Sequence, residues 1–459
     1  MIELTTENMA AAMGAEVISR GPGGVPGRAE IDSRKITGGE LFFGLTGGQS
    51  DGGEHARAAL EAGAWGVVVT PERAAGLAET GAFVFAAEDP LLALQMLARA
   101  WRRELGATVI GITGSVGKTS VKDITRALLP GSVHASAENF NTEIGLPMTI
   151  LEAPAETETL VLEMAMRGRG QIAELAMIAE PDIGVITNVG PVHVELLGSI
   201  EAVAAAKAEL IGGLREGGAM VVPWEAGHLE PLLDGVPGLI RFGGAGDVRV
   251  VEQEVVAGAT RARIETLQGS QAFEFPFAEP HNLINAQAAI AAGVAAGFTP
   301  AELAARTDGI AFSRFRNEHI DLGDRGLIVN DCYNANPVSM RAALEYLAQI
   351  DRDRKLAVLG LMAELGPGEV GFHEEIGRVA RDLGIEVISV GDLARAYDPD
   401  LKAGSPEEAA RLLGERLGPD VAVLIKGSRA AGLERVTELV TAAASESDLS
   451  GSAGRGSAA

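Results

Sequence analysis

Residues 108–129 read TVIGITGSVGKTSVKDITRALL, and this stretch decides the fold class. A run of apolar and small residues typical of a buried strand leads into a glycine-rich turn, and a helical pattern follows the turn. Glycines in such a turn let backbone N–H groups approach a phosphate, and the N-terminus of the helix adds positive potential. Lys118 would neutralise the phosphates, and the Thr119 hydroxyl would bind Mg²⁺. The stretch therefore predicts a nucleotide-binding α/β domain.

The turn departs from the usual phosphate-loop pattern at one position. The pattern G-x-x-x-x-G-K-[ST] requires glycine at position 112, where this chain has Ile112, and the glycine stands at Gly111 instead. The motif is therefore G-x-T-G-S-x-G-K-T. A chance glycine-rich turn is the alternative interpretation, but a strand before the GKT core and a helix after it favour a phosphate loop.

The alternation of strand, loop and helix continues along the chain. Continuous apolar strands at 159–165 and 183–190 are each followed by a helical pattern, which indicates a parallel sheet covered on both faces. A β-rich region of alternating character follows at 248–277, and the βα alternation returns after residue 316. We predict an α/β protein of three domains: an N-terminal α/β domain (1–106), a central parallel-sheet ATPase domain of the P-loop type (107–312) and a C-terminal Rossmann-like α/β domain (313–445), followed by a flexible tail (446–459).

Charge and composition exclude several classes of protein. The chain has 459 residues, with 38 Lys and Arg against 63 Asp and Glu, which gives a net charge of −25. A field of that sign repels phosphate backbones and anionic membranes, so we expect no nucleic-acid partner. Cys332 is the single cysteine, which excludes a disulfide framework and a cysteine-based zinc site. No segment approaches the roughly 18–20 apolar residues that span a bilayer, and no secretory signal is recognisable, so we expect a cytoplasmic protein.

Three further residues are candidates for chemistry. Glu163 and His193 each follow a predicted parallel strand, at the edge where ligands collect in open α/β sheets, so a carboxylate there can hold the Mg²⁺ of a nucleotide. Glu163 as an ion-pair partner of Arg167 and His193 as an ordinary loop histidine are the alternatives. Lys207, among alanines in a helical pattern, is by itself typical of an exposed helix surface.

Four polar residues suit a nucleoside. Asn282 and Asn285 lie one helical turn apart and can read a purine edge, although helix capping is the commoner role of such amides. A planar guanidinium such as Arg316 suits stacking on adenine, and a carboxylate such as Asp331 suits ribose hydroxyls. The polar stretch 331–337, DCYNANP, is of a kind that usually forms a structural turn.

Together these segments resemble the ATP-dependent Mur ligases over residues 32–429, which spans all three predicted domains. EMAMRG around Glu163, TNVGPVHVELLGS around His193, AKAE around Lys207 and HNLINA at 281–286 match the family in order. The discriminating segment is DCYNANPVSM at 331–340, which resembles the D-x-Y-N-A-N-P-x-S-M of the MurF type.

The resemblance implies an ATP-dependent amide ligase that adds D-alanyl-D-alanine to UDP-N-acetylmuramoyl-tripeptide through an acyl phosphate, in peptidoglycan synthesis. It implies ATP and two Mg²⁺ as cofactors, with Lys118 and Thr119 on the phosphates. Lys207 matches the family lysine that becomes a carbamate. Because the three ligands would come from three domains, we expect domain closure to assemble the site. We also expect a monomer.

The residues implied fall into four groups. The catalytic residues are Lys118, Lys207, His193 and Glu163. The metal ligands are Thr119, Glu163, His193 and carbamylated Lys207. The ATP-binding residues are Gly114, Ser115, Gly117, Lys118, Thr119, Ser120, Asn282, Asn285, Arg316 and Asp331. The substrate-binding residues are Ser33 and Arg34 for the uridine diphosphate, with Asn139, Asn141, Thr142, Asn334, Asn336, Lys426 and Arg429.

Other functions remain as alternatives. The chain departs from the motifs of the MurF type at Thr142, where an Asn is usual, and at Leu361, where an Asp is usual. A diaminopimelate- or lysine-adding ligase or a folylpolyglutamate synthetase-like enzyme is the alternative within the superfamily, and residues 331–337 argue against both. A non-catalytic ATP-binding switch is the alternative outside it, and Glu163, His193 and Lys207 argue against that.

Overall fold

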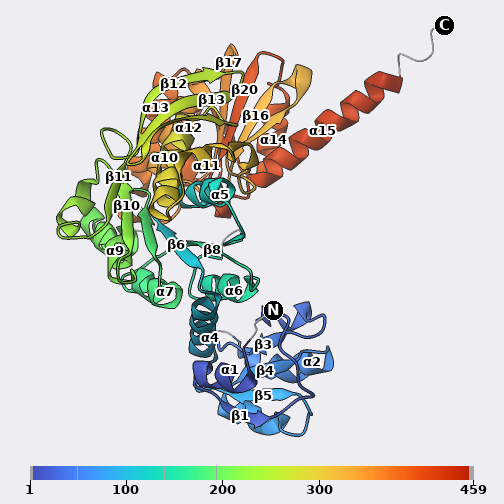
Figure 1. The fold of residues 1–459 in the computed structure, drawn as a ribbon. Coiled ribbons are helices and arrows are strands. Elements are labelled where there is room, and N and C mark those ends of the chain that lie inside the picture. The colour runs from blue at the N-terminus through green and yellow to red at the C-terminus, as the bar shows by residue number, and fades with distance from the viewer. Residues whose placement is uncertain (1–3, 49, 138–139, 193, 454–459) are drawn as a thin grey trace.

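The computed structural model describes residues 4–48, 50–137, 140–192 and 194–453. Figure 1 shows the N-terminal part in blue, joined through the long helix α4 to the central part, with the C-terminal part at the far end. The sheets lie within the three predicted segments of the chain. The predicted α/β class is confirmed.

The N-terminal part contains a five-stranded sheet in the order β1-β5-β4-β3-β2, parallel except for β1. Its strands are β1 (Glu16–Ser19), β2 (Ala29–Glu30), β3 (Leu41–Phe43), β4 (Gly66–Val69) and β5 (Phe83–Ala86). Its helices are α1 (Thr6–Met13), α2 (Ala56–Glu61), α3 (Pro71–Ala74) and α4 (Pro90–Leu105).

Helix α4 connects the first two parts. The Asp89 side chain accepts hydrogen bonds from the backbone N–H groups of Leu91 and Leu92, and Gly106 ends the helix with a φ of 63°. Trp101 is buried, and its Nε1 donates to the carbonyl of Ala153 at 3.2 Å. The N-terminal and central parts therefore share one continuous hydrophobic core along this helix.

The central part is built on a parallel sheet in the order β11-β10-β9-β6-β8-β7. A three-stranded antiparallel sheet, β12-β13-β14, accounts for the β-rich region. The strands are β6 (Thr108–Thr113), β7 (Val133–Ala135), β8 (Thr159–Glu163), β9 (Ile183–Ile186), β10 (Ala219–Pro223), β11 (Leu239–Phe242), β12 (Arg249–Val256), β13 (Ala259–Thr266) and β14 (Gly269–Phe275). The helices are α5 (Lys118–Leu128), α6 (Gly145–Glu152), α7 (Gln171–Ala179), α8 (Val194–Leu197), α9 (Ile200–Gly212), α10 (Pro280–Ala295) and α11 (Pro300–Ala304).

The order of the central sheet positions the site. β6 is the first of its strands in sequence and lies inside the sheet, with β8 on one side and β9 on the other. The connections therefore leave β6 in opposite directions, so the loops after these three strands lie at a topological switch point, the place where ligands bind in such sheets. We call this place the crevice. The phosphate-loop motif begins at the end of β6.

The C-terminal part has a second six-stranded sheet, in the order β15-β16-β20-β17-β18-β19, parallel except for β15. Apolar clusters cover both of its faces. The strands are β15 (Glu318–Asp321), β16 (Leu327–Asp331), β17 (Arg354–Leu359), β18 (Glu386–Val390), β19 (Leu401–Ala403) and β20 (Val421–Lys426). The helices are α12 (Pro337–Gln349), α13 (Glu369–Asp382), α14 (Pro406–Gly414) and α15 (Glu434–Ala453).

The last helix extends into the segment predicted as a tail. α15 continues through Ala453, and Figure 1 shows it projecting from the C-terminal part, while the flexibility of residues 446–459 stays a prediction. No proline interrupts this stretch, and Ala, Glu and Leu favour helix, so a helix started on the core can propagate beyond it. Among the described residues, no helix combines the length and apolar character needed to cross a membrane.

Candidate active site

The glycine-rich turn joins β6 to α5. Gly114 has a φ of 153°, and Gly117, with a φ of 82°, is the N-cap of α5. The positive φ of Gly117 favours glycine, and a Cβ there would lie 2.6 Å from Oδ1 of Asn285 on α10, so the Asn285 side chain would have to shift. Gly111 lies within β6, where a Cβ would meet Cε of Met164 at 2.9 Å. The displaced glycine of the motif therefore serves packing of the strand.

A residue that sequence analysis did not single out holds the turn in place. Oδ1 of Asn188, just after β9, accepts hydrogen bonds from the backbone N–H groups of Ser115 at 3.1 Å and Val116 at 2.9 Å. The Ser115 hydroxyl accepts from the N–H of Gly190 at 2.8 Å. Ser115, predicted to bind ATP, thus already uses its hydroxyl inside the protein. The signal for Asn188 was its place in the TNVG segment at the carboxyl end of a parallel strand.

Glu163 is buried beside the turn. Its Oε2 accepts from the Thr119 hydroxyl at 2.8 Å, and its Oε1 accepts from Nδ2 of Asn141 at 2.9 Å. The alternative of an ion pair between Glu163 and Arg167 is wrong, because Arg167 pairs with Glu364 at 3.5 Å. The structure brings together two of the predicted metal ligands, Thr119 and Glu163. Asn141, predicted to bind substrate, orients the carboxylate.

Two lysines lie in this crevice. Nζ of Lys118 donates to the carbonyl of Gly114 at 3.0 Å, and burial lowers its pKa. Lys207 on α9 is 2% exposed, so the alternative of a surface lysine is wrong. Burial, together with the charge of Lys118, lowers the pKa of Lys207 well below its ordinary value. No hydrogen bond or ion pair joins its ammonium group to any residue in the described ranges. An unpaired buried ammonium is costly, so this lysine is suited to being neutral or modified.

The adenosine candidates form two groups. Nδ2 of Asn285 donates to Oδ1 of Asn282 at 3.2 Å, and Nδ2 of Asn282 donates to the buried Glu279 at 3.3 Å. The alternative that these amides cap the helix is wrong, because Glu279 is the N-cap of α10. Arg316 donates to the Thr119 hydroxyl at 3.2 Å, and its guanidinium lies 4.2 Å from the ring centre of Tyr333. Asn285 and Arg316 therefore approach the phosphate loop from two sides.

The C-terminal candidates surround the ends of β16 and β20. Buried Lys426 pairs with Asp331 at 2.5 Å and donates to the carbonyl of Asn334 at 3.1 Å. Asn336 is the N-cap of α12 and accepts from the N–H of Ser339 at 3.0 Å. Arg429 pairs with Glu434 at 3.3 Å. Asp331 therefore lies in an ion pair, and its predicted contact with ribose stays a prediction.

The remaining candidates are spread over several segments of the chain. Ser33 and Arg34 lie in a short 3₁₀ helix of the N-terminal part, where Arg34 pairs with Asp32 at 2.8 Å. Within the described ranges no hydrogen bond or ion pair links them to the crevice. Thr142 is exposed before α6, and Ser120 lies in the first turn of α5. His193 and Asn139 lie outside the described residues.

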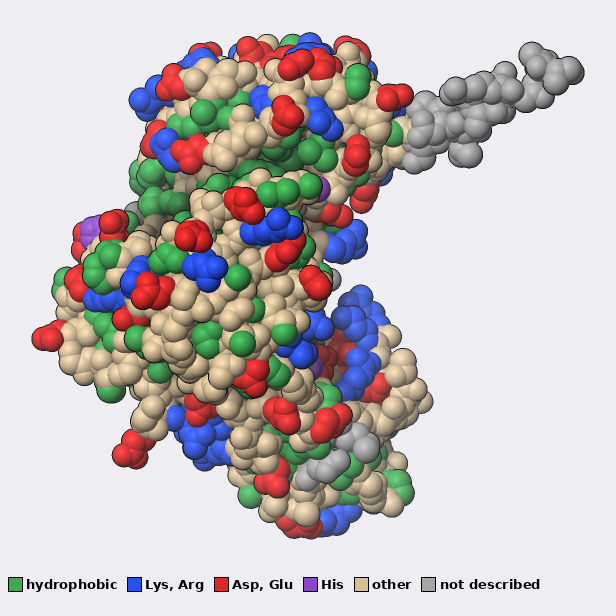
Figure 2. All heavy atoms as spheres, turned by 45° about the horizontal axis from the view of Figure 1, so that its top comes forward, with side chains coloured by type: hydrophobic (Ala, Val, Ile, Leu, Met, Phe, Trp, Pro, Cys, Tyr) green, Lys and Arg blue, Asp and Glu red, His purple; other side chains and the backbone are tan. Residues whose placement is uncertain are grey.

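The described residues include a basic hollow on the surface (Figure 2) but no ready-made metal site. Figure 2 shows Lys and Arg side chains gathered where the surface is hollowed between the N-terminal lobe and the middle of the molecule. Within the described ranges, no group of three His, Cys, Asp or Glu side chains is arranged to hold a metal ion. A site built from Thr119, Glu163 and a modified Lys207 would not form such a group.

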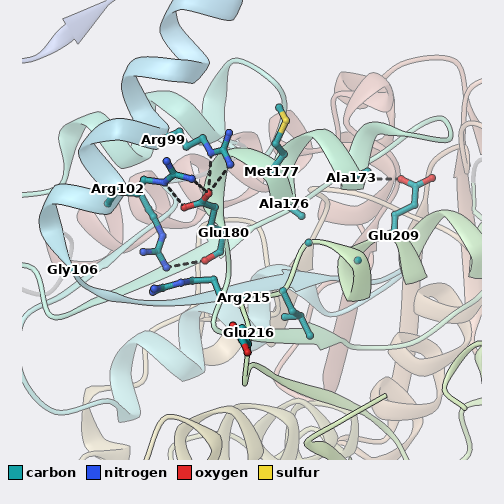
Figure 3. Close-up of a pocket in the computed structure, with 14 residues that line it drawn as sticks. Arg99, Arg102, Gly106, Ala173, Ala176, Met177, Glu180, Glu209, Arg215 and Glu216 are labelled. Carbon is teal, nitrogen blue, oxygen red and sulfur yellow. Dashed lines mark hydrogen bonds and ion pairs between the residues drawn. The ribbon is translucent and has the colours of Figure 1, made fainter. Parts of the chain in front are cut away.

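A cavity of about 900 Å³ lies elsewhere, between α4, α7 and α9. Figure 3 shows Arg99 and Arg102 turned toward Glu180. The Glu180 carboxylate pairs with Arg99 at 2.7 Å and with Arg103. Glu180 is the C-cap of α7, and Arg102 donates to its carbonyl at 2.8 Å. The arginines thus satisfy a helix C-terminus and its cap. None of the predicted site residues lines this cavity.

Comparison with known proteins agrees with this geometry. Residues 112–293 match the Mur ligase middle domain, and residues 315–429 match the Mur ligase glutamate ligase domain. UDP-N-acetylmuramoyl-tripeptide–D-alanyl-D-alanine ligase of Bacillus subtilis is 40% identical, with 76% of each chain covered. The ligase of the same name from Mycobacterium tuberculosis is 35% identical, with 96% of this chain and 98% of the relative covered. The chain belongs to the Mur ligase family.

A solved structure extends this relationship to three dimensions. The MurF ligase of Thermotoga maritima in complex with ADP matches with a TM-score of 0.80 and 30% identity. The match covers 94% of this chain and 99% of that one. The predicted family and its MurF type are confirmed.

Proposed function

We propose that this Mur ligase uses ATP to join D-alanyl-D-alanine to UDP-N-acetylmuramoyl-tripeptide, giving UDP-N-acetylmuramoyl-pentapeptide, ADP and phosphate in the cytoplasmic stage of peptidoglycan synthesis. The observation that carries the proposal is the crevice after β6, where the phosphate loop, the Thr119–Glu163 pair and buried Lys207 lie together. Relatives at 35–40% identity over most of the chain support the same reaction.

The residues present fit ATP. Gly117 carries no side chain over the turn, so backbone N–H groups at the start of α5 can face phosphate oxygens. Lys118, folded over the turn, can exchange the carbonyl of Gly114 for a phosphate oxygen. Asn285 and Arg316 flank the turn and would contact the nucleotide beyond its phosphates.

The residues present also fit Mg²⁺. The Thr119 hydroxyl and the Glu163 carboxylate supply the oxygen ligands that Mg²⁺ prefers, and Asn141 fixes the orientation of the carboxylate. Bound Mg²⁺ would neutralise charge that develops on the transferring phosphoryl group. His193 remains a predicted second ligand.

Lys207 is suited to carbamylation. Its lowered pKa favours the free amine, which can attack CO₂ to form an N–C bond and release one proton. The product is a carbamate anion at a place where the unmodified ammonium has no partner among the described residues. A carbamate there would add a third oxygen ligand facing the phosphates.

The ligation then needs positioning more than covalent catalysis. The tripeptide carboxylate attacks the γ-phosphorus of ATP, ADP leaves, and an acyl phosphate forms. The dipeptide amine attacks the acyl carbon, and phosphate leaves from the tetrahedral intermediate. Lys118 and the backbone of the turn hold the phosphates in line, and such positioning and charge stabilisation supply most of the acceleration in phosphoryl transfer.

Phosphate release tests the proposal. ATP, Mg²⁺ and UDP-N-acetylmuramoyl-tripeptide are supplied with and without D-alanyl-D-alanine, and the product is identified by mass spectrometry. We expect release that requires both substrates and a pentapeptide product. Release driven by diaminopimelate, lysine or glutamate would instead place the chain in another branch, and no release with any acceptor would support an ATP-binding switch.

We further propose that the enzyme acts as a monomer without nucleic acid. Its net charge of −25 supports the second statement, because that charge repels phosphate backbones. Light scattering coupled to size exclusion measures the first, and a stable dimer at assay concentration would contradict it.

A further inference from the structure

The loop after β17, residues 360–366, lies at the edge of the C-terminal sheet where the predicted substrate residues gather. β16, β20 and β17 are neighbours in the sheet, and the loops that follow them share one edge. The N–H of Ala363 donates to the Ser428 hydroxyl at 3.0 Å, and the N–H of Ser428 donates to the carbonyl of Leu361 at 2.9 Å. The 360–366 loop is therefore bound to the 426–429 segment.

The same loop also faces the central part of the molecule. Glu364 pairs with Arg167, which follows β8, at 3.5 Å. A Cβ at Gly366 would lie 3.1 Å from Cβ of Glu195 on α8. The 360–366 loop thus lies between the edge of the C-terminal sheet where the predicted substrate residues gather and the segments after β8 and β9. Under the proposed function, this is where the acceptor amine would meet the activated carboxyl group.

The backbone of this loop is under strain and depends on outside support. Glu364 has a φ of 63°, a conformation that costs a non-glycine residue about 1–3 kcal/mol. Such a conformation persists only where surrounding contacts determine it. Two buried side chains hydrogen-bond to the backbone at the start of the loop, and neither is hydrogen-bonded to a predicted site residue among the described residues.

These side chains are His373 on α13 and Tyr397. Nε2 of His373 accepts a hydrogen bond from the N–H of Met362 at 2.9 Å, so this nitrogen carries no proton. Nδ1 therefore carries the proton and donates to the carbonyl of Glu369 at 2.7 Å. The Tyr397 hydroxyl donates to the carbonyl of Gly360 at 2.8 Å, and its ring centre lies 4.9 Å from that of His373.

We propose that His373 is a positioning residue for the ligation, which holds the 360–366 loop in the conformation that receives the dipeptide. The inference rests on the proposed function. His373 is 0% exposed, and its direct hydrogen bond to the loop is the one from the N–H of Met362. Burial lowers the pKa of its imidazole, in agreement with the neutral tautomer that the hydrogen bonds require.

Two substitutions separate the two hydrogen bonds of the ring. In His373→Gln, the longer amide can still accept from the N–H of Met362. In His373→Asn, the shorter amide can donate to the carbonyl of Glu369 but does not reach Met362. We expect His373→Asn to raise the KM for D-alanyl-D-alanine about tenfold, with the KM for ATP unchanged, because a buried backbone N–H loses its acceptor. His373→Gln is expected to restore the dipeptide KM to within about threefold of wild type.

Hydrogen exchange of peptides that cover residues 360–366 gives a readout independent of activity. We expect faster exchange at Met362 in His373→Asn and wild-type exchange in His373→Gln. His134→Gln is the matched control, since His134 is a partly buried histidine of β7 that bonds the carbonyl of Thr149 at 3.0 Å, far from the loop in sequence. It should change neither readout.

The outcomes distinguish the inference from the proposed function. Unchanged exchange at Met362 in His373→Asn would overturn the positioning role, whatever the enzyme ligates. Faster exchange with an unchanged dipeptide KM would also overturn it. Equal losses in both variants, in every kinetic constant and in the melting temperature, would mean a purely structural histidine. A wild-type enzyme without dipeptide-dependent phosphate release would refute the proposed function, while the exchange result would still decide whether His373 holds the loop.

Discussion

At the scale of single residues, the contacts in the structure show features of the candidates in the crevice that the sequence does not show. Thr119 and Glu163 lie 44 positions apart, yet they share a hydrogen bond of 2.8 Å because β6 and β8 are neighbours in the sheet. Lys207 carries no local signal, and only the resemblance to a family pointed to it. Its burial and lack of a partner in the described ranges provide an independent physical argument.

Lys207→Ala tests the carbamate. We expect ligase activity to fall about a hundredfold or more, because a charge-stabilising group at the transferring phosphoryl is lost. Added short carboxylic acids should restore part of the activity by supplying the missing anion in the space left by the side chain. Lys355→Ala, on the C-terminal domain away from the crevice, is the control. Unchanged activity in Lys207→Ala would remove the carbamate role.

Glu163→Gln tests the predicted metal ligand. The amide keeps the shape and one acceptor for the Thr119 hydroxyl, but it lacks the charge that attracts Mg²⁺. We expect kcat to fall about a hundredfold and the Mg²⁺ concentration for half-maximal rate to rise. Glu158→Gln, just before the start of the same strand, should leave both unchanged. If Glu163→Gln responded to Mg²⁺ like wild type, Glu163 would not be a ligand.

At the scale of elements, the loops after parallel strands carry many of the candidate site residues. The 331–337 stretch was predicted both as a usual structural turn and, through the family resemblance, as part of the substrate site. Asn336 has the first role, because it forms a capping box with Ser339 at the start of α12. Capping does not exclude the second role, so the two must be separated by measurement.

Asn336→Ala should lower the free energy of unfolding by about 1 kcal/mol, because the N-terminus of α12 loses its cap. Asn336→Ser should keep the stability, since a hydroxyl also caps a helix. Urea unfolding measures both variants, and the dipeptide KM is measured in parallel. A Ser variant that is stable but has a raised KM would support substrate binding, whereas full activity in both variants would limit Asn336 to capping.

At the scale of the whole molecule, α4 fastens the N-terminal part to the central part. Arg99, Arg102 and Arg103 on this helix converge on the C-cap of α7. Arg102 is 2% exposed, and its guanidinium also pairs with Asp182 at 3.0 Å. These bonds therefore stabilise the junction between the N-terminal and central parts. The predicted domain boundary at residue 106 gives no indication of them.

Glu180 should make this junction sensitive to acid. The hydrogen bond from Arg103, with a further one from Arg99, outweighs burial and lowers the pKa of Glu180 from 4.5 to about 2. The folded state therefore binds fewer protons, and the stabilisation is complete above pH 4.5 and is lost as the pH falls toward 2.

Glu180→Gln measures this contribution. We expect a lower urea midpoint than wild type at pH 7 and a difference that shrinks as the pH falls, because the wild-type carboxylate is then protonated too. Glu216→Gln, a change in the same cavity, is the control and should follow wild type. A difference that stays constant from pH 7 to pH 3 would contradict the pairing of Glu180 with the arginines.

Domain closure is the remaining prediction at this scale. Ser33 and Arg34 have no hydrogen bond or ion pair to the phosphate loop in the described ranges. One molecule of UDP-N-acetylmuramoyl-tripeptide would nevertheless have to reach from these two residues to the ATP phosphates at the loop. We expect small-angle scattering to show a smaller radius of gyration once a non-hydrolysable ATP analogue and UDP-N-acetylmuramoyl-tripeptide are both present. The analogue alone serves as the comparison, and an unchanged radius with both ligands would contradict closure.

The sequence by itself determined the features that depend on local chemistry. A glycine-rich turn between an apolar strand and a helix predicts a phosphate loop wherever it occurs, because backbone geometry and helix polarity are properties of adjacent residues. Alternating strands and helices likewise predicted the parallel sheets. The family and its branch followed from motifs along the chain, and the comparisons confirmed them.

Only the tertiary structure decided which groups are buried and what they contact. Glu163 bonds Thr119 and Asn141 and not Arg167, and Asn188 supports the phosphate loop. His373 accepts a hydrogen bond from the N–H of Met362, eleven positions earlier in the chain. The contacts of Glu163 with Thr119 and of Asn188 with the phosphate loop join segments that the order of strands brings together, and burial strengthens them by removing water. The type of a residue does not show which other residue it contacts. The residues that support the candidate site could therefore be found only in the fold.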